Sequence, residues 1–164
     1  MKAFFVTIYE LFRSLFSVDL ADHLYGLDNT GSTNVRSLYV YVGLAMLVIS
    51  LIIAAIYYYA VNNSKYNRWY HWTMALVLNA VINLFLGFYL PFRDYQAGTI
   101  ADEIRPGVGI GDLWGFGFAN ALVSLFFFFA FSMILQNKSR NYANVPFSLV
   151  GLFARKSKRN TEGG

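Results

Sequence analysis

The sequence predicts an all-α integral membrane protein with three transmembrane helices and an N-terminal amphipathic helix at the membrane interface. Of its 164 residues, 57% are hydrophobic and only 13% are charged, whereas soluble domains carry about 25% charged residues. Three stretches of more than 20 residues contain no Asp, Glu, Lys or Arg between their ends, which is the length a membrane-spanning helix needs. Tyr and Trp gather near the ends of these stretches, where their rings favour the headgroup region.

The first segment, residues 1–37, is expected to form an amphipathic helix and a connector. In residues 3–24, large apolar side chains recur at spacings of three and four, which places them on one face of a helix. Such a helix lies in the membrane interface or packs on a neighbouring subunit, and the sequence leaves both open. Residues 26–37 are polar and contain glycine, as connectors do. Charged residues interrupt the first apolar stretch, so we expect no cleaved signal peptide.

The three-helix transmembrane domain is expected to cover residues 38–135, with spans at about 38–61, 70–92 and 113–135. The loop between the last two spans, residues 93–112, carries six charged residues and alternating glycines in PGVGIG. This is not a phosphate-binding loop, because the Lys-Ser/Thr pair of that motif is missing. We expect a flexible outer loop there, with a gate or a partner-binding loop as the alternative.

The distribution of positive charge predicts the orientation of the chain. With three spans, the first loop and the tail share one side of the membrane, and this side holds eight Lys and Arg against five on the other side. The side richer in Lys and Arg is the cytoplasmic one. We therefore expect the N-terminus outside and the C-terminus in the cytoplasm, in a bacterial inner (plasma) membrane.

The tail, residues 136–164, is expected to be a basic cytoplasmic segment. Its apolar stretch PFSLVGLF precedes a cluster formed by Arg155, Lys156, Lys158 and Arg159. Each cation near an anionic lipid surface contributes about 1 kcal/mol of binding, so the cluster predicts contact with lipid or another anionic partner. Contact with nucleic acid or nucleotide is the weaker alternative, because four charges are a weak signal.

The sequence contains few groups that could carry chemistry. It has no Cys and only two His, His23 and His71, which the predicted topology places on opposite faces of the membrane. It has no motif of a hydrolase, a metalloprotease or a nucleotide-binding enzyme. We therefore predict a protein that is not an enzyme and that needs no metal or cofactor. The spans also lack the ionisable residue that proton- or ion-coupled transport usually requires.

The polar residues inside the spans are neutral. In the second span, His71, Ala75, Asn79, Asn83 and Gly87 are spaced by four, which makes them one ridge on a helix. Asn83 and Asn120 each lie about 5 Å to the outer side of their span's centre. We therefore predict that Asn83 faces Asn120 and that Asn79 lies near Ser124.

These amides, with Gly87, have two possible roles. Interhelical hydrogen bonds by Asn contribute about 0.6–2 kcal/mol to the association of helices in membranes, and this alone explains the ridge. Neutral polar groups also line pores in oligomers. One three-helix bundle is too small to enclose a water-filled path, so a pore requires several copies.

Two functions follow from these alternatives. The first, which we favour from the sequence, is a homo-oligomeric channel or pore-forming effector, for example in immunity, toxicity or lysis; its general layout is similar to that of some phage holins, by analogy and without a sequence match. The second is a structural or accessory subunit of a larger membrane complex. Membrane lipids are the expected partners in both cases, together with copies of this chain in the first and other membrane subunits in the second.

Overall fold

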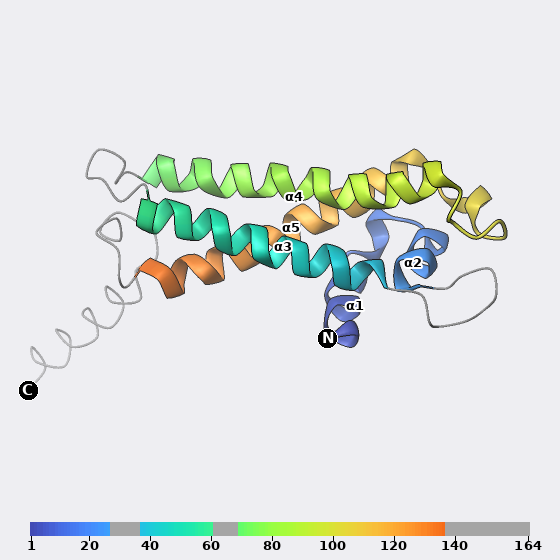
Figure 1. The fold of residues 1–164 in the computed structure, drawn as a ribbon, viewed down its shortest axis with the longest axis horizontal. Coiled ribbons are helices and arrows are strands. Elements are labelled where there is room, and N and C mark those ends of the chain that lie inside the picture. The colour runs from blue at the N-terminus through green and yellow to red at the C-terminus, as the bar shows by residue number, and fades with distance from the viewer. Residues whose placement is uncertain (27–36, 61–68, 137–164) are drawn as a thin grey trace, which may run out of the picture.

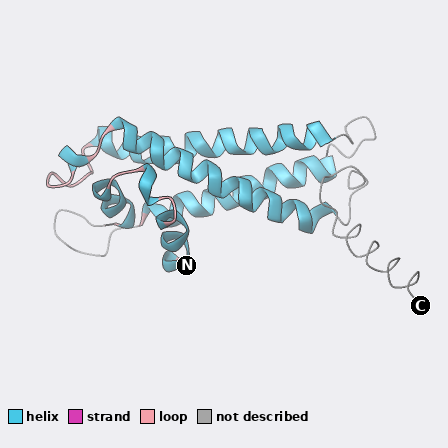
Figure 2. Ribbon diagram, turned by 180° about the vertical axis from the view of Figure 1, so that it is seen from behind, coloured by secondary structure: helices cyan, strands magenta, loops and turns pink. Residues whose placement is uncertain are grey.

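The computed structural model describes residues 1–26, 37–60 and 69–136, and every regular element in these ranges is a helix (Figure 2). The elements are α1 (Lys2–Glu10), α2 (Val18–Tyr25), α3 (Leu38–Ala55), α4 (Trp69–Ala97) and α5 (Ile110–Leu135). The three long helices α3, α4 and α5 lie side by side, and α1 and α2 gather at the end where α4 ends and α5 begins (Figure 1). The predicted all-α class is confirmed, with three helices long and apolar enough to cross a membrane.

The first span runs from α3 into a π-helical turn, Ile56–Ala60. Tyr57 and Tyr58, which are neighbours in the sequence, are both buried in this turn. In an α-helix, neighbouring side chains point about 100° apart. Tyr57 and Tyr58 pack with Trp72 and Phe128 in a cluster at this end of the bundle. The Trp72 indole N–H also donates to the Ser132 hydroxyl at 3.3 Å.

The second span continues beyond its predicted end at residue 92, through Pro91, to Ala97. Its end is set by Gly98, whose φ of +69° is a left-handed conformation that glycine adopts without strain. The Gly98 N–H donates to the Tyr95 carbonyl, and the Thr99 N–H donates to the Asp94 carbonyl. These two bonds are those of a Schellman cap. Arg93 and Asp94 therefore lie on α4 and not in the loop where the sequence analysis placed them.

Helix α5 begins at Ile110, three residues before the predicted start of its span. Its first turn is fixed by Asp112, whose Oδ2 accepts a hydrogen bond from the Gly109 N–H at 2.8 Å. A carboxylate at this place is favoured by the positive end of the helix dipole. Asp112 Oδ1 also accepts from the Ser17 N–H at 2.8 Å, so one carboxylate ties the N-terminal segment to α5.

The amphipathic segment expected as one helix over residues 3–24 is two helices joined by a 3-10 turn, Arg13–Leu15. The break comes before Ser17, whose hydroxyl accepts from the Leu20 N–H and caps α2. Each half turns a face toward the bundle and buries it completely, with Tyr9 on α1 and Leu20 on α2. Phe4, Leu11 and Val18 stay exposed, which suits contact with the membrane interface.

The N-terminal segment packs on the three-helix bundle of the same chain at positions occupied by glycine. The Phe5 ring covers Gly43 of α3, and the Leu15 carbonyl lies against Gly115 of α5. The Asp19 carboxylate lies against Gly107 in the loop before α5. A Cβ at any of these glycines would collide with its partner, so their missing side chains allow the close approach.

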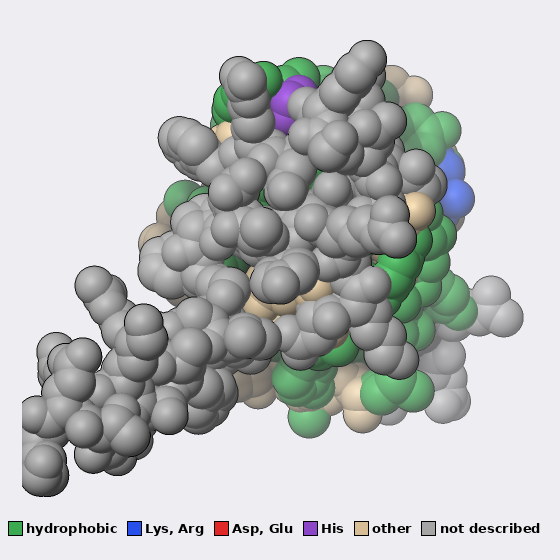
Figure 3. All heavy atoms as spheres, turned by 90° about the vertical axis from the view of Figure 1, so that its left-hand side faces the viewer, with side chains coloured by type: hydrophobic (Ala, Val, Ile, Leu, Met, Phe, Trp, Pro, Cys, Tyr) green, Lys and Arg blue, Asp and Glu red, His purple; other side chains and the backbone are tan. Residues whose placement is uncertain are grey.

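The end of the bundle on which α1 and α2 pack has an aromatic core. Tyr9 stacks on Tyr39 with ring centroids 5.5 Å apart, and Phe116 contacts both rings. These three side chains come from α1, α3 and α5, so the core joins the N-terminal helix to two spans. Many large hydrophobic side chains of the three spans are exposed, and most of the described side chains that show in the end-on view of Figure 3 are hydrophobic too.

Candidate functional site

A chain of buried hydrogen bonds joins α4 and α5 in the middle of the spans. The Asn120 side-chain Nδ2 donates to the Asn83 carbonyl at 2.6 Å, and Asn79 Nδ2 donates to the Ser124 carbonyl at 3.2 Å. Along α4, Asn83 Nδ2 donates to the Asn79 carbonyl and to its Oδ1, at 2.9 and 3.1 Å. The predicted pairing of Asn83 with Asn120 and of Asn79 with Ser124 is thus confirmed as contacts.

Tyr9 extends this chain from the N-terminal helix. Its hydroxyl donates to Asn120 Oδ1 at 2.6 Å, and the Tyr9 side chain is completely buried. Burial raises the pKa of Tyr9, and the neighbouring Tyr39 adds to the rise. The hydroxyl therefore keeps its proton and remains a donor. Tyr9 was not predicted as a site residue, because in the sequence it is one of several large side chains on an amphipathic face.

Gly87 and Gly117 bring the two helices close together beside the amides. A Cβ at Gly87 would lie 2.8 Å from Asn120 Cβ, and one at Gly117 would lie 2.8 Å from the Leu84 carbonyl oxygen. Small residues at such positions let helices in membranes approach closely enough for side chains to bond across them. In the structure, Gly87 is therefore a helix-packing position.

Four polar side chains of α4 and α5 face the inside of one subunit. Asn79, Asn83, Asn120 and Ser124 are each 0% exposed in the single chain. Their contacts are those of helix packing, and a pore-lining role stays a prediction. One acceptor of the group, Asn83 Oδ1, has no hydrogen-bond partner among the described residues, so its burial costs some of the stability that the other bonds supply.

A second feature is a partly open cavity of about 680 Å³ between α2, α3, α4 and the start of the following loop. Its volume lies within the range of about 300–1,000 Å³ that is usual for small-molecule sites. The apolar part of its wall consists of Leu38, Tyr41 and Ala45 from α3 and Leu86 and Leu90 from α4. The polar part consists of His23, Arg93, Asp94 and Thr99.

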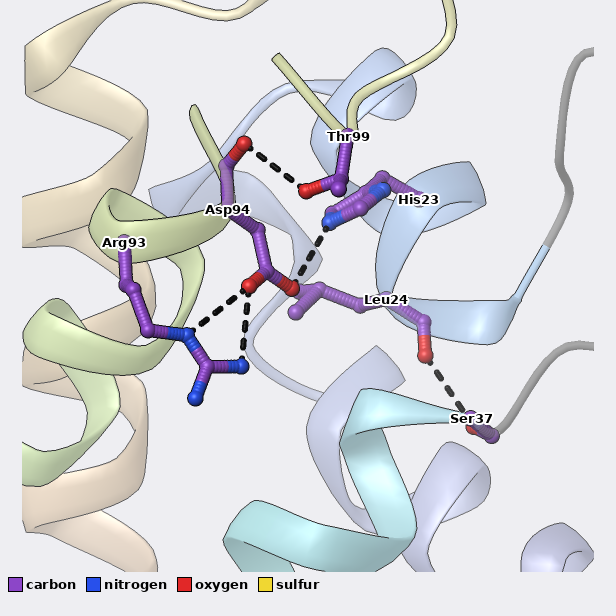
Figure 4. A network of polar contacts seen from close by, with 6 residues as sticks. All are labelled: His23, Leu24, Ser37, Arg93, Asp94 and Thr99. Atoms are coloured by element: carbon purple, nitrogen blue, oxygen red, sulfur yellow. Dashed lines mark hydrogen bonds and ion pairs between the residues drawn. The ribbon is translucent and has the colours of Figure 1, made fainter. Parts of the chain in front are cut away.

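The polar end of the cavity is a small hydrogen-bonded group (Figure 4). Arg93 donates through Nε and Nη2 to Asp94 Oδ1 at 3.1 and 3.0 Å. The Thr99 hydroxyl donates to the Asp94 carbonyl at 2.9 Å. His23 Nε2 lies 3.6 Å from Asp94 Oδ2, which is beyond an ordinary hydrogen bond. The Schellman cap at Gly98 holds Asp94 and Thr99 in this arrangement.

The charge of this group is balanced. Burial lowers the pKa of His23, and Asp94 opposes the shift without reversing it. The imidazole is therefore neutral at pH 7, because its ordinary pKa of about 6.5 is already below that pH. Arg93 and Asp94 are left as one positive and one negative group side by side. The Arg93 side chain is 58% exposed, so its guanidinium lies at the mouth of the cavity.

The sequence analysis did not predict this cavity. It placed Arg93 and Asp94 in a flexible loop and His23 in a segment of uncertain contacts. The basic cluster Arg155, Lys156, Lys158 and Arg159 lies outside the described residues. Comparison with protein-family models, with curated proteins and with solved structures finds no match for the chain.

Proposed function

We propose that this chain is a structural or accessory subunit of a larger membrane assembly, without enzymatic activity. The observation that carries the proposal is the inward direction of the polar groups in the spans. Asn79, Asn83, Asn120 and Ser124 are buried between α4 and α5 and bonded there. Their hydrogen bonds are made within the subunit, so the outer surface of the bundle is available for contact with lipid or with other helices.

The outer faces of the spans support this role. On α5, Trp114, Phe118, Leu122 and Phe126 are exposed and spaced by four, so they form one continuous row. On α4, every exposed side chain from Tyr70 to Tyr89 is apolar or aromatic. Rows of large apolar side chains of this kind fit against lipid chains or against the apolar face of a partner helix.

The homo-oligomeric pore that the sequence analysis favoured stays a prediction. Its main support was the amide ridge, and these amides do not face outward from the single subunit. A pore built from several copies requires a polar face toward a shared axis. Along α3 and into the π-helical turn that follows it, the exposed side chains from Leu44 to Ile56 are all aliphatic, which does not supply one.

The proposal places the subunit in a bacterial inner (plasma) membrane, with the N-terminus outside and the C-terminus in the cytoplasm. The charge distribution supports this orientation, with eight Lys and Arg on the side of the first loop and the tail. In this orientation, the polar end of the cavity and the N-terminal helices lie at the outer surface. The basic tail is then available to anionic lipid of the cytoplasmic leaflet.

Native mass spectrometry of the protein expressed alone and purified in mild detergent tests the proposal. We expect a monomer of 18.6 kDa, or a protein that is lost unless a partner is co-expressed. A discrete closed oligomer contradicts the proposal and supports the pore, because closed symmetric assembly is what a homo-oligomeric channel requires. In that case, electrical recordings should change with Asn79→Ala and Asn83→Ala but not with Val81→Ala, an exposed apolar position between them along α4.

A further inference from the structure

We infer that the cavity between α2, α3 and α4 binds one phospholipid with a zwitterionic headgroup. The lining of this cavity has an apolar part and a polar part. Apolar side chains from α3 and α4 form one part of the wall, and four polar side chains of α4, α2 and the following loop form the other. A small number of polar groups at one end of an apolar cavity can orient a ligand that has both a polar and an apolar part.

The length and depth of the cavity fit a lipid. Along α4, the lining runs from Leu86 to Asp94, which spans about 12 Å at the helical rise per residue. Along α3, it runs from Leu38 to Ala45, which spans about 10 Å. One leaflet of a bilayer has a hydrocarbon depth of about 15 Å. An acyl chain beside Ala45 and Leu86 therefore lies at hydrocarbon depth while its headgroup reaches Arg93 and Asp94.

The charges at the polar end select the type of headgroup. Arg93 and Asp94 lie side by side at the end of α4, where Arg93 Nη2 is 3.0 Å from Asp94 Oδ1. Two of the guanidinium N–H groups are used in this pair, and an Arg has five. The remaining donors suit a phosphate, which guanidinium N–H groups bind through charge-assisted hydrogen bonds.

Asp94, next to Arg93, supplies the negative charge at this end of the cavity. Asp94 Oδ2 faces His23, and this imidazole is neutral at pH 7 because burial lowers its pKa. The carboxylate is therefore not neutralised by a second cation, and it can accept hydrogen bonds from a ligand ammonium group. A headgroup with a phosphate and an ammonium group matches this pair, whereas a headgroup with a phosphate alone meets an unmatched carboxylate.

Binding of defined lipids tests the inference. The purified protein is mixed with vesicles that contain equal amounts of phosphatidylethanolamine, phosphatidylglycerol and diacylglycerol with identical acyl chains, and native mass spectrometry then identifies the retained lipid. We expect one retained molecule of phosphatidylethanolamine. Retention of no lipid, or of phosphatidylglycerol in preference, overturns the inference, and so does equal retention of all three.

Two variants with matched controls locate the lipid. Ala45→Phe fills the apolar part of the cavity and should weaken retention roughly tenfold, whereas Leu44→Phe at the neighbouring exposed position should not. Arg93→Gln should remove the preference for phosphatidylethanolamine over diacylglycerol, whereas Arg105→Gln in the exposed loop should keep it. Arg93 is largely exposed, so its variant is expected to fold even if Ala45→Phe does not. Unchanged lipid retention in both cavity variants contradicts the assignment.

Discussion

Asn120→Leu should lower the free energy of unfolding more than any other change in the amide chain, by about 2–4 kcal/mol. The Asn120 side chain accepts from the Tyr9 hydroxyl and donates to the Asn83 carbonyl, both at 2.6 Å. Leucine has a similar volume, so the loss comes from the buried Tyr9 hydroxyl, which is left without a partner, and from the lost bond to the Asn83 carbonyl, which keeps only its bond within α4. Unfolding in mixed micelles with increasing denaturing detergent measures the change.

A double-mutant cycle separates this bond from general damage. Tyr9→Phe removes only the hydroxyl that donates to Asn120, and it leaves the aromatic packing on Tyr39 and Phe116 in place. Once Tyr9 is phenylalanine, Asn120→Leu should cost about 0.5–3 kcal/mol less than it does in the wild type. Additive effects of the two substitutions would mean that the Tyr9–Asn120 bond does not contribute to stability.

Gly115→Ala should detach the N-terminal segment from the bundle, at a cost of about 1–3 kcal/mol. A Cβ at Gly115 collides with the Leu15 carbonyl, and a backbone group cannot move aside as the end of a long side chain can. The segment must therefore shift as a unit. Hydrogen exchange should show faster exchange of residues 1–26, with little change in α4.

Gly111→Ala is the matched control for this substitution. Gly111 lies one turn earlier on α5, and a Cβ there meets nothing within 4 Å. Alanine is favoured over glycine in a helix by about 1 kcal/mol, so this variant should be neutral or slightly more stable. Equal destabilisation by the two variants would contradict the close approach of residue 15 to α5.

The spans and the amide contacts could be predicted from the sequence because they depend on local patterns. Hydropathy and length identify the three spans, and the spacing of four places Asn79, Asn83 and Gly87 on one ridge. The depth of Asn83 and Asn120 follows from counting residues along straight antiparallel helices. These arguments require only helix geometry and the thickness of the membrane.

The predicted end of the second span, at residue 92, was wrong because the prediction used hydropathy instead of helix capping. The apolar pattern stops at the charged Arg93, but a helix ends where its last carbonyls find other partners. Gly98 is the signal that was available, since glycine is the usual residue after a helix end. With this boundary, Arg93 and Asp94 move from the loop to the helix, and the polar end of the cavity becomes visible.

The docking of the N-terminal segment could not be predicted, because it depends on contacts between residues far apart in the sequence. Gly43 and Gly115 have no local feature that shows what lies over them. Tyr9 is one of several large side chains on an amphipathic face, and only the packed structure shows that its hydroxyl reaches Asn120. The cavity arises in the same way, from the spacing of α3 and α4 beside α2.

The most direct test of the account is a cross-link between the N-terminal helix and α5 of the same subunit. The chain contains no cysteine, so Phe4→Cys with Phe127→Cys creates the only thiol pair; these rings have centroids 6.5 Å apart. A short bifunctional thiol reagent should link them within one chain, whereas Phe4→Cys with Ile134→Cys, roughly 10 Å further along α5, should react poorly. Linkage only between differently tagged subunits, or equal linkage of the two pairs, would contradict an N-terminal segment that packs on its own bundle.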